Sequence, residues 1–209
     1  MPSVKPRMPK RVRKHVNPLA DRTEIRFEGF GNTQPIIVDI GAYKGEFTSK
    51  LLGAFGRSYN YIVTEIRKPF AWYLEELFNQ YGNVRVFTGN SANNIQGLLQ
   101  SSVEQGSRIA YIFVNFPDPW LKDKHKKRRI VTRQFLDTLA LLFDYESLLV
   151  FQTDQESLFF DTQALVDEMP QWEHEEYQEP LWGIQSHWER VKIDEGKDIY
   201  RMKISLKRK

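Results

Sequence analysis

The chain has 209 residues, of which 41% are hydrophobic and 13% aromatic, and this suits one globular domain with a sizeable core. It contains no cysteine, so disulfides and thiolate metal sites are excluded. No apolar run reaches about eighteen residues, and the basic N-terminus lacks an apolar h-region. We therefore expect neither a membrane span nor a signal peptide, and a cytoplasmic protein.

The net charge of +3 is distributed unevenly along the chain. Residues 1–22 hold seven Lys or Arg and one Asp, and residues 122–129 hold six Lys or Arg and one Asp. The remainder is acidic. Two basic segments in such a chain indicate an anionic partner that is held at two places, although a basic tail also favours solubility.

The N-terminal segment, residues 1–22, has four prolines and no apolar periodicity. This composition predicts a flexible basic arm that can order on RNA. We expect residues 23–209 to form a single domain, because the sequence shows neither a linker nor an internal repeat.

The rest of the chain alternates between strand and helix patterns, which predicts an α/β, Rossmann-like fold with a mostly parallel sheet and helices on both faces. The tail differs, with an acidic stretch at 173–179 and a last strand at 198–206, and we expect a late hairpin whose antiparallel strand closes the sheet edge. The expected strands are 34–40, 59–64, 84–88, 108–116 and 147–152, and the expected helices are 46–55, 68–81, 92–102, 132–143 and 156–168.

Ligands of doubly wound sheets bind at the carboxyl ends of the strands, which selects the turn 39–45, Glu65, Asn90 and Asp118. Glu65 ends the second strand, where a carboxylate can accept both ribose hydroxyls of an adenosine. A nicotinamide-dependent oxidoreductase would also fit Glu65, but it leaves Asp118 and the basic run without a purpose.

The step Phe116-Pro117-Asp118-Pro119-Trp120 follows a buried strand and precedes the basic run. Each proline pushes the residue before it into an extended conformation, so we expect Asp118 to be fixed at the rim of the sheet. Trp120 could stack on a base or fill the foot of the loop. A fixed carboxylate beside many cations suggests a polyanion held by its phosphates while one base is recognised, whereas the alternatives are a rigid turn and a solvated loop.

In this step, and in Lys127-Arg128-Arg129-Ile130 behind it, the sequence resembles the bacterial-type tRNA (guanine-N7-)-methyltransferases. The resemblance extends from about Lys10 to the C-terminus. It implies a class I methyltransferase fold, S-adenosylmethionine as cofactor, and methyl transfer to N7 of a guanine in tRNA. By resemblance this guanine is the variable-loop guanine, position 46 of the tRNA.

The resemblance also implies the cofactor residues. Asp39, Gly41 and Gly45 match the acidic residue and two glycines of the turn at the methionine part, Glu65 matches the ribose ligand, and Asn90 stands where an acidic residue usually lies beside adenine. Tyr43 replaces the central glycine of the turn. If the protein is active, we expect its ring to lie outside the cofactor pocket and its backbone to avoid positive φ.

Guanine N7 carries a lone pair and no proton, so its methylation needs alignment and charge stabilisation rather than a base. We assign this catalytic role to Asp118, which can accept hydrogen bonds from guanine N1–H and the exocyclic amine. The resemblance adds the substrate residues Asp154, Ser186 and Glu189, although Asp154 also suits a helix N-cap and Glu189 a surface acid. We expect Lys122 to contact the substrate as well.

The basic run supplies the RNA contacts that we expect, from Lys126, Lys127, Arg128 and Arg129. His125 lies among these cations, so its pKa should fall, and we assign it to RNA contact. No spacing of His, Asp or Glu resembles a metal site, and we expect a monomer or homodimer. The alternative function is a catalytically impaired tRNA-binding protein on a methyltransferase scaffold, which Tyr43 and Asn90 suggest.

Overall fold

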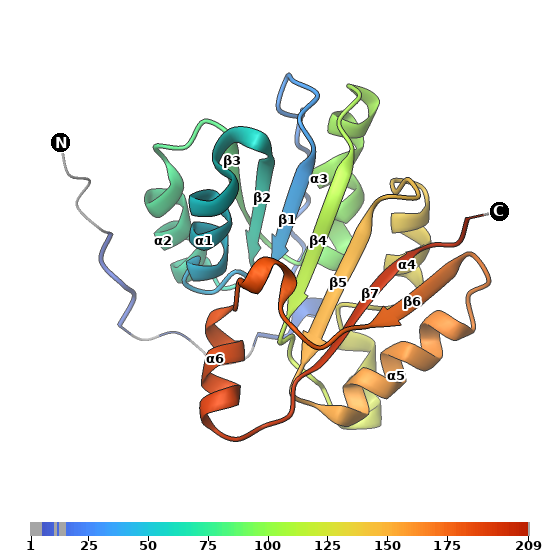
Figure 1. The fold of residues 1–209 in the computed structure, drawn as a ribbon. Coiled ribbons are helices and arrows are strands. Elements are labelled where there is room, and N and C mark those ends of the chain that lie inside the picture. The colour runs from blue at the N-terminus through green and yellow to red at the C-terminus, as the bar shows by residue number, and fades with distance from the viewer. Residues whose placement is uncertain (1–5, 11, 13–15, 209) are drawn as a thin grey trace.

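The computed structural model describes residues 6–10, 12 and 16–208. Its centre is one seven-stranded sheet with the order β3-β2-β1-β4-β5-β7-β6 (Figure 1). The predicted α/β, Rossmann-like class is confirmed. The strands are β1 (Ile36–Ile40), β2 (Asn60–Glu65), β3 (Val84–Thr88), β4 (Ile109–Asn115), β5 (Leu148–Thr153), β6 (Trp172–Glu176) and β7 (Tyr200–Leu206).

The strands β3, β2, β1, β4 and β5 are parallel, and β7 runs antiparallel between β5 and β6. The expected antiparallel strand near the C-terminus is confirmed, but residues 177–199, which include α6, join β6 to β7 in place of a hairpin turn. The sequence did not mark β6 itself as a strand, because its acidic residues lie on an open edge and only Trp172 at its start is buried. Charged side chains on an edge strand discourage pairing with other chains.

The helices flank the sheet in two layers (Figure 1). The first five lie within a few residues of their expected positions, whereas α6 was not expected. Their bounds are α1 (Glu46–Phe55), α2 (Lys68–Phe78), α3 (Ser91–Glu104), α4 (Arg133–Ala140), α5 (Glu156–Asp167) and α6 (His187–Asp194).

Two hydrophobic cores lie on opposite faces of the sheet. Ile36 and Val38 of β1 face the core that includes side chains of α3, α4 and α5, while Ile37 between them faces the core of α1 and α2. Alternate residues of one strand point to opposite faces, and parallel strands are covered on both. This explains why the strands read as continuous apolar runs. None of the helices described has the length and apolarity to cross a membrane.

The part of the N-terminal arm that the structure describes from residue 16 onward lies against the domain, whereas residues 1–5, 11 and 13–15 are outside the described residues. A short 3-10 helix, η1 (Pro18–Ala20), leads to Asp21, whose carboxylate accepts the backbone N–H of Asn90. Further on, the carbonyl oxygen of Ile25 lies where a Cβ on Gly97 would come within 2.1 Å. Only glycine fits at this crossing of chain and helix.

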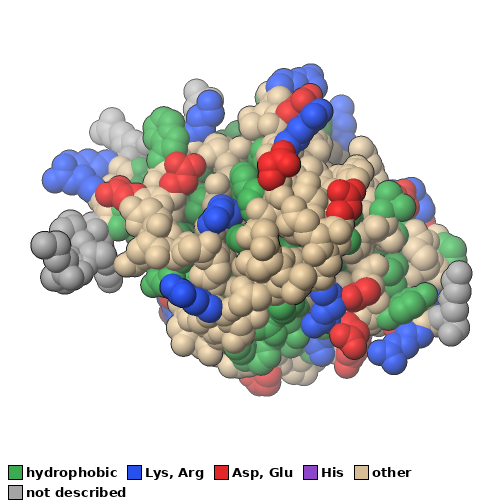
Figure 2. Space-filling view, turned by 90° about the horizontal axis from the view of Figure 1, so that it is seen from above, with side chains coloured by type: hydrophobic (Ala, Val, Ile, Leu, Met, Phe, Trp, Pro, Cys, Tyr) green, Lys and Arg blue, Asp and Glu red, His purple; other side chains and the backbone are tan. Residues whose placement is uncertain are grey.

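The two ends of the parallel strands, carboxyl and amino, lie in different surroundings; below, the carboxyl edge means the side of the sheet where the parallel strands end. The carboxyl ends of the parallel strands face residues 16–22, α6 and the loop after β4, at the bottom of Figure 1. The opposite edge, viewed from above in Figure 2, carries Lys and Arg interspersed with Asp and Glu. The carboxyl edge is therefore where the fold assembles the predicted site residues.

Candidate active site

A cavity of about 370 Å³ opens at the carboxyl ends of the parallel strands. This volume is within the range of small-molecule sites, which is roughly 300–1,000 Å³. The cavity brings together predicted site residues from five different segments of the chain: Gly41, Glu65, Asn90, Asp118 and Asp154. These five residues, from both the predicted cofactor set and the predicted acceptor set, therefore share one space.

Gly41 and Gly45 have different roles in the turn after β1. Both have positive φ, 75° and 70°. A Cβ on Gly41 would meet no heavy atom within 4 Å, whereas a Cβ on Gly45 would lie 2.6 Å from Leu74. Gly41 leaves backbone open to a ligand, while Gly45, which does not line the main cavity, allows α1 to pack on α2.

Asp39 is buried beneath this turn and does not line the main cavity. It accepts a hydrogen bond of 2.6 Å from the Thr48 hydroxyl. Burial raises the pKa of Asp39 to about 6, while the Thr48 hydrogen bond acts against that rise and the charge of Glu65 adds to it. Asp39 thus supports the turn from inside.

Glu65 lies in the cavity wall, but its carboxylate is already engaged by four donors. The backbone N–H and Nε of Arg67 donate to Oε1, and Arg67 Nη2 and the Tyr43 N–H donate to Oε2, over 2.7–3.1 Å. Two oxygens offer about four acceptor positions, so the carboxylate is saturated. A ribose hydroxyl could reach Glu65 only if one donor left, and of the four donors only the two from the Arg67 side chain are not fixed in the backbone.

Tyr43 does not line the main cavity but helps to line a neighbouring cavity of about 20 Å³, and the expectation that its backbone avoids positive φ was wrong. Its φ is 54°. The ring packs against Phe70 at 4.7 Å and Trp188 at 5.4 Å between centroids, and the Arg67 guanidinium lies 5.3 Å from its centre. These contacts stabilise a left-handed conformation that costs a non-glycine residue roughly 1–3 kcal/mol.

Asn90 lines the cavity and caps α3. Its Oδ1 accepts the N–H of Ala92 at 3.1 Å, and its Nδ2 donates to the carbonyl oxygen of Pro18 at 3.1 Å. The amide therefore joins the described end of the arm to the cavity wall. An acidic residue at this position could not donate to Pro18, which gives the amide a structural reason in this chain.

The Pro-Asp-Pro step is bounded by two residues with left-handed backbones, Phe116 at φ 51° and Trp120 at φ 43°. The expectation that proline keeps its predecessor extended was wrong for Phe116. Its N–H donates to the Gln152 carbonyl oxygen at 2.8 Å, and this tertiary contact overrides the local preference. Strained backbone of this kind concentrates at functional sites, and here it holds Asp118 in the cavity wall.

The basic run after Trp120 forms a 3-10 helix, η3 (Asp123–Arg128). Its cations lie in three environments: paired with a carboxylate, in the cavity wall, or exposed. Lys126 and Arg129 pair with Asp161 of α5 at 3.1 and 2.7 Å, so they anchor the loop. Arg128 lines the cavity with its guanidinium 4.9 Å from the centre of the Trp120 ring. Lys127 is exposed, as is Lys122 at the start of the run.

His125 has a pKa below its usual value, as expected from its neighbours. Desolvation is the largest cause, followed by the charges of Arg128, Lys124 and Lys122. Its ring meets that of Trp120 edge to face at 5.8 Å. The ring therefore packs against Trp120, which lines the cavity.

The three predicted acceptor residues near the C-terminal half lie in different environments. Asp154 lines the cavity with Lys192 Nζ at 3.5 Å, and it is not the N-cap of α5, which is Gln155. Ser186 and Glu189 do not line the main cavity but form a capping box at the start of α6. Glu189 is fully buried, so its interpretation as a surface acid was wrong.

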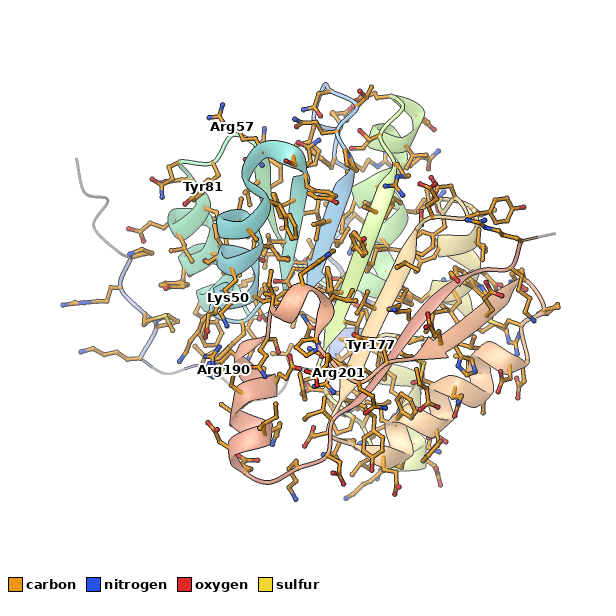
Figure 3. The ribbon with its side chains drawn as sticks, in the orientation of Figure 1. Lys50, Arg57, Tyr81, Tyr177, Arg190 and Arg201 are labelled. Atoms are coloured by element: carbon orange, nitrogen blue, oxygen red, sulfur yellow. The ribbon has the colours of Figure 1, made fainter. Side chains whose placement is uncertain are left out.

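Glu189 forms a buried ion pair with Arg201 of β7 at 2.6 Å. Figure 3 shows Arg201 near α6, at the edge opposite to Arg57 and Tyr81. The pair anchors α6 to the sheet. Through α6, two residues that the sequence did not single out, Trp188 and Lys192, reach the cavity. The Ser-x-x-Glu capping pattern could have located this helix.

Arg67 and Asn115 also line the cavity without having been singled out from the sequence. Arg67 stands two residues after Glu65, where a bidentate pair with its carboxylate is possible, but no pattern predicts it. In the part of the chain that the structure describes, no group of three or more His, Cys, Asp or Glu side chains is arranged to hold a metal ion.

The strand order with antiparallel β7, together with a ligand cavity at the carboxyl ends, defines a class I S-adenosylmethionine-dependent methyltransferase fold. A solved structure, 16S rRNA methyltransferase KamB, superposes with a TM-score of 0.56 at 11% identity and covers 83% of this chain and 88% of that one. At this identity the likeness concerns the fold alone.

Sequence comparison narrows the class. The family described as "Putative methyltransferase" matches residues 33–202. The tRNA (guanine-N(7)-)-methyltransferase of Trichormus variabilis is 32% identical over 70% of this chain and 71% of its own. That of Thermosynechococcus vestitus is 28% identical over 91% of this chain and 92% of its own. The chain belongs to the tRNA (guanine-N7-)-methyltransferase family.

Proposed function

We propose that this protein transfers a methyl group from S-adenosylmethionine to N7 of a guanine in tRNA, by resemblance the variable-loop guanine. The observation that carries the proposal is that Asp118, held in a strained Pro-Asp-Pro step, lines the same cavity as Gly41 and Glu65. An acceptor residue and the cofactor residues thus face one space. The ring of Tyr43 does not line that space, although it helps to line the neighbouring cavity of about 20 Å³ beside Gly41.

The residues of the cavity suit the cofactor. Gly41 offers open backbone for its methionine part, Glu65 would accept its ribose hydroxyls once Arg67 moves, and Asn90 lies where adenine would be. When bound, the cofactor supplies a methyl group on a positively charged sulfur. The protein's own task is to align guanine N7 with that methyl group in a site from which water is excluded.

Asp118 is the residue to which we assign recognition of the guanine. Its carboxylate can accept hydrogen bonds from N1–H and the exocyclic amine, a pair of donors that adenine lacks. Methylation of N7 leaves a positive charge on the ring, and a carboxylate at this place offsets it. No proton has to leave N7, so no general base is required.

We further propose that tRNA is bound by the exposed Lys122 and Lys127, by Arg128 and by the basic arm, residues 1–22. Exposed cations hold phosphates without reading sequence, which leaves base recognition to the cavity. In this proposal residues 23–209 act as one catalytic domain in the cytoplasm, as a monomer or homodimer.

The test is to replace Asp118 by Ala and measure single-turnover methylation of tRNA. Loss of a hydrogen bond to a charged group is worth about 1.5–3 kcal/mol, so the rate should fall by at least one to two decades. The affinities for S-adenosylmethionine and tRNA should change little. The matched control is Asp137→Ala, an exposed carboxylate on α4. A wild-type rate in Asp118→Ala would contradict the assignment.

A further inference from the structure

The side chain of Asn115 combines an engaged oxygen with an unpartnered nitrogen. It ends β4 and lies beside Gln152 of β5 in the sheet register. Its Oδ1 accepts a hydrogen bond of 2.8 Å from Gln152 Nε2. Its Nδ2 is buried and has no hydrogen-bond partner in the described structure. A buried donor without a partner is unfavourable, so it points to an acceptor from outside the chain.

Asn115 lies between two cavities. The residue lines the main cavity together with Asp118, and also a neighbouring cavity of about 20 Å³ that Tyr43 and Ser186 help to line. A ligand in the main cavity and a single water in the small one are thus the two possible sources of an acceptor.

The orientation of the Asn115 amide follows from a buried relay. Gln152 Nε2 lies 3.5 Å from Glu189 Oε2, and Glu189 is held as an acceptor by Arg201 at 2.6 Å and by the Ser186 N–H at 3.2 Å. Gln152 must therefore present its nitrogen in this direction, and Asn115 must present its oxygen to Gln152. The nitrogen of Asn115 is left for another partner.

We propose that Asn115 is a guanine-recognition residue, whose amide nitrogen donates a hydrogen bond to O6 of the target guanine. The proposal rests on the proposed function. N7 must stay free for methylation, and Asp118, in the loop that follows Asn115, takes the donors N1–H and the exocyclic amine. O6 is the acceptor next to N1–H on that edge of the base. Adenine carries an amine at this place, and two donors would then face each other.

The proposal also includes four positioning residues: Ser186, Glu189, Arg201 and Gln152. None of them needs to touch the base, because they orient the Asn115 amide through Gln152. The relay explains how a fully buried pair, Glu189 and Arg201, acts on recognition at the cavity wall.

The experiment combines a change in the enzyme with a change in the base. The tRNA carries guanosine or 6-thioguanosine at the position that the wild-type enzyme methylates, and kcat/KM is measured for both. Sulfur is the weaker acceptor, while the other edge groups are kept. We expect the wild type to lose about tenfold on the thio base, and Asn115→Ala to be about tenfold slower on guanosine with no further loss on the thio base.

Three further variants separate recognition from folding. Asn115→Asp, which replaces the donor by an acceptor, should be slower than Asn115→Ala on guanosine, and a merely structural role would not predict this order. Gln152→Met removes the amide that orients Asn115 and should also reduce the thio penalty. Gln96→Ala, on the exposed side of α3, is the control and should keep both rates. Calorimetry should show unchanged S-adenosylmethionine affinity in all of them.

The outcomes that overturn the proposal are distinct. If Asn115→Ala keeps the full thio penalty and weakens cofactor binding, the nitrogen contacts the methionine part of the cofactor instead. If Asn115→Ala keeps both the penalty and the rate, a water in the small cavity satisfies the nitrogen. A wild-type protein that methylates no guanine would overturn the proposed function itself, and this inference with it.

Discussion

Tyr43 is held in its left-handed backbone conformation by its ring. Tyr43→Gly would remove a strain of roughly 1–3 kcal/mol, but it would also remove contacts with Phe70 and Trp188 that are worth about 0.5–1.5 kcal/mol each beyond area burial. With the loss of buried ring area added, we expect Tyr43→Gly to lower the free energy of unfolding by about 1–2 kcal/mol.

The affinity of Tyr43→Gly for S-adenosylmethionine should stay within about threefold of the wild type, because the ring does not line the main cavity. Tyr43→Asn, which tolerates positive φ and lacks the ring, is the matched control and should show a similar loss of stability. A gain of a decade or more in cofactor affinity for the glycine variant would mean that the ring fills the cofactor site.

Asp39 is expected to make stability depend on pH. Its pKa in the folded protein is about 6, above its usual 3.8, so the folded state binds the proton more tightly than the unfolded state. The resulting stabilisation is present below the unfolded pKa and is lost as the pH rises through the folded pKa. Between about pH 4 and pH 7 the loss amounts to about 2 kcal/mol.

The measurement is urea unfolding of the wild type and Asp39→Asn across this pH range. The asparagine can still accept the Thr48 hydrogen bond but does not titrate. The difference in unfolding free energy between the two proteins should shift by about 2 kcal/mol, while contributions common to both cancel. One such common group is Glu46, whose pKa is lowered to about 2, chiefly by its hydrogen bond to Arg190. A difference that is constant with pH would show that Asp39 is not perturbed.

At the scale of elements, α6 depends on its first turn. Glu189→Ala would leave Arg201 buried without its carboxylate, which typically costs about 3–5 kcal/mol, whereas Ser186→Ala removes one cap and costs about 1 kcal/mol. We therefore expect urea unfolding to rank the two variants in this order. Glu195→Ala, an exposed carboxylate at the end of α6, is the control. A loss below about 1 kcal/mol in Glu189→Ala would show that the pair does not anchor the helix.

The elements also differ in how far the sequence predicts them. The bounds of α1 agree with the prediction, because the turn glycines before it and the apolar spacing within it are local signals. The strand β6 was missed because its acidic residues lie on the edge of the sheet and it pairs only with β7, and the helix α6 was missed although its Ser-x-x-Glu capping pattern is a local signal. Pairing with a strand about 30 residues further along the chain leaves no periodic pattern in β6 itself.

The site residues also differ in how far the sequence predicts them. Gly41, Glu65, Asn90, Asp118 and Asp154 could be placed together because parallel strands end at one edge and the family resemblance supplied their roles. Asp39, Ser186 and Glu189 belong to the support beneath that edge. The sequence indicates which residue types are unusual, but burial decides whether they touch a ligand.

At the scale of the whole molecule, the basic run lies at the end of the sheet that holds the cavity. Arg128 of the run and Val16 and Pro18 from the described part of the arm line the cavity, while the opposite end of the sheet carries both signs of charge (Figure 2). Within the run, Lys126 and Arg129 are committed to Asp161, so replacing all the cations at once would disturb the loop as well as RNA binding. A test of the RNA surface therefore has to replace cations that do not form an ion pair with Asp161.

Lys127→Ala is such a test. Each phosphate contact contributes about 0.7–0.9 to the slope of log K against log salt, so this variant should bind tRNA with a slope lower by about that amount and with unchanged S-adenosylmethionine affinity. Arg57→Ala removes the same charge at the opposite edge, where Figure 3 shows Arg57, and should leave the slope unchanged. Equal slopes for Lys127→Ala and the wild type would mean that Lys127 is merely solvated. Equal reductions in both variants would mean that tRNA responds to net charge rather than to the edge that holds the cavity.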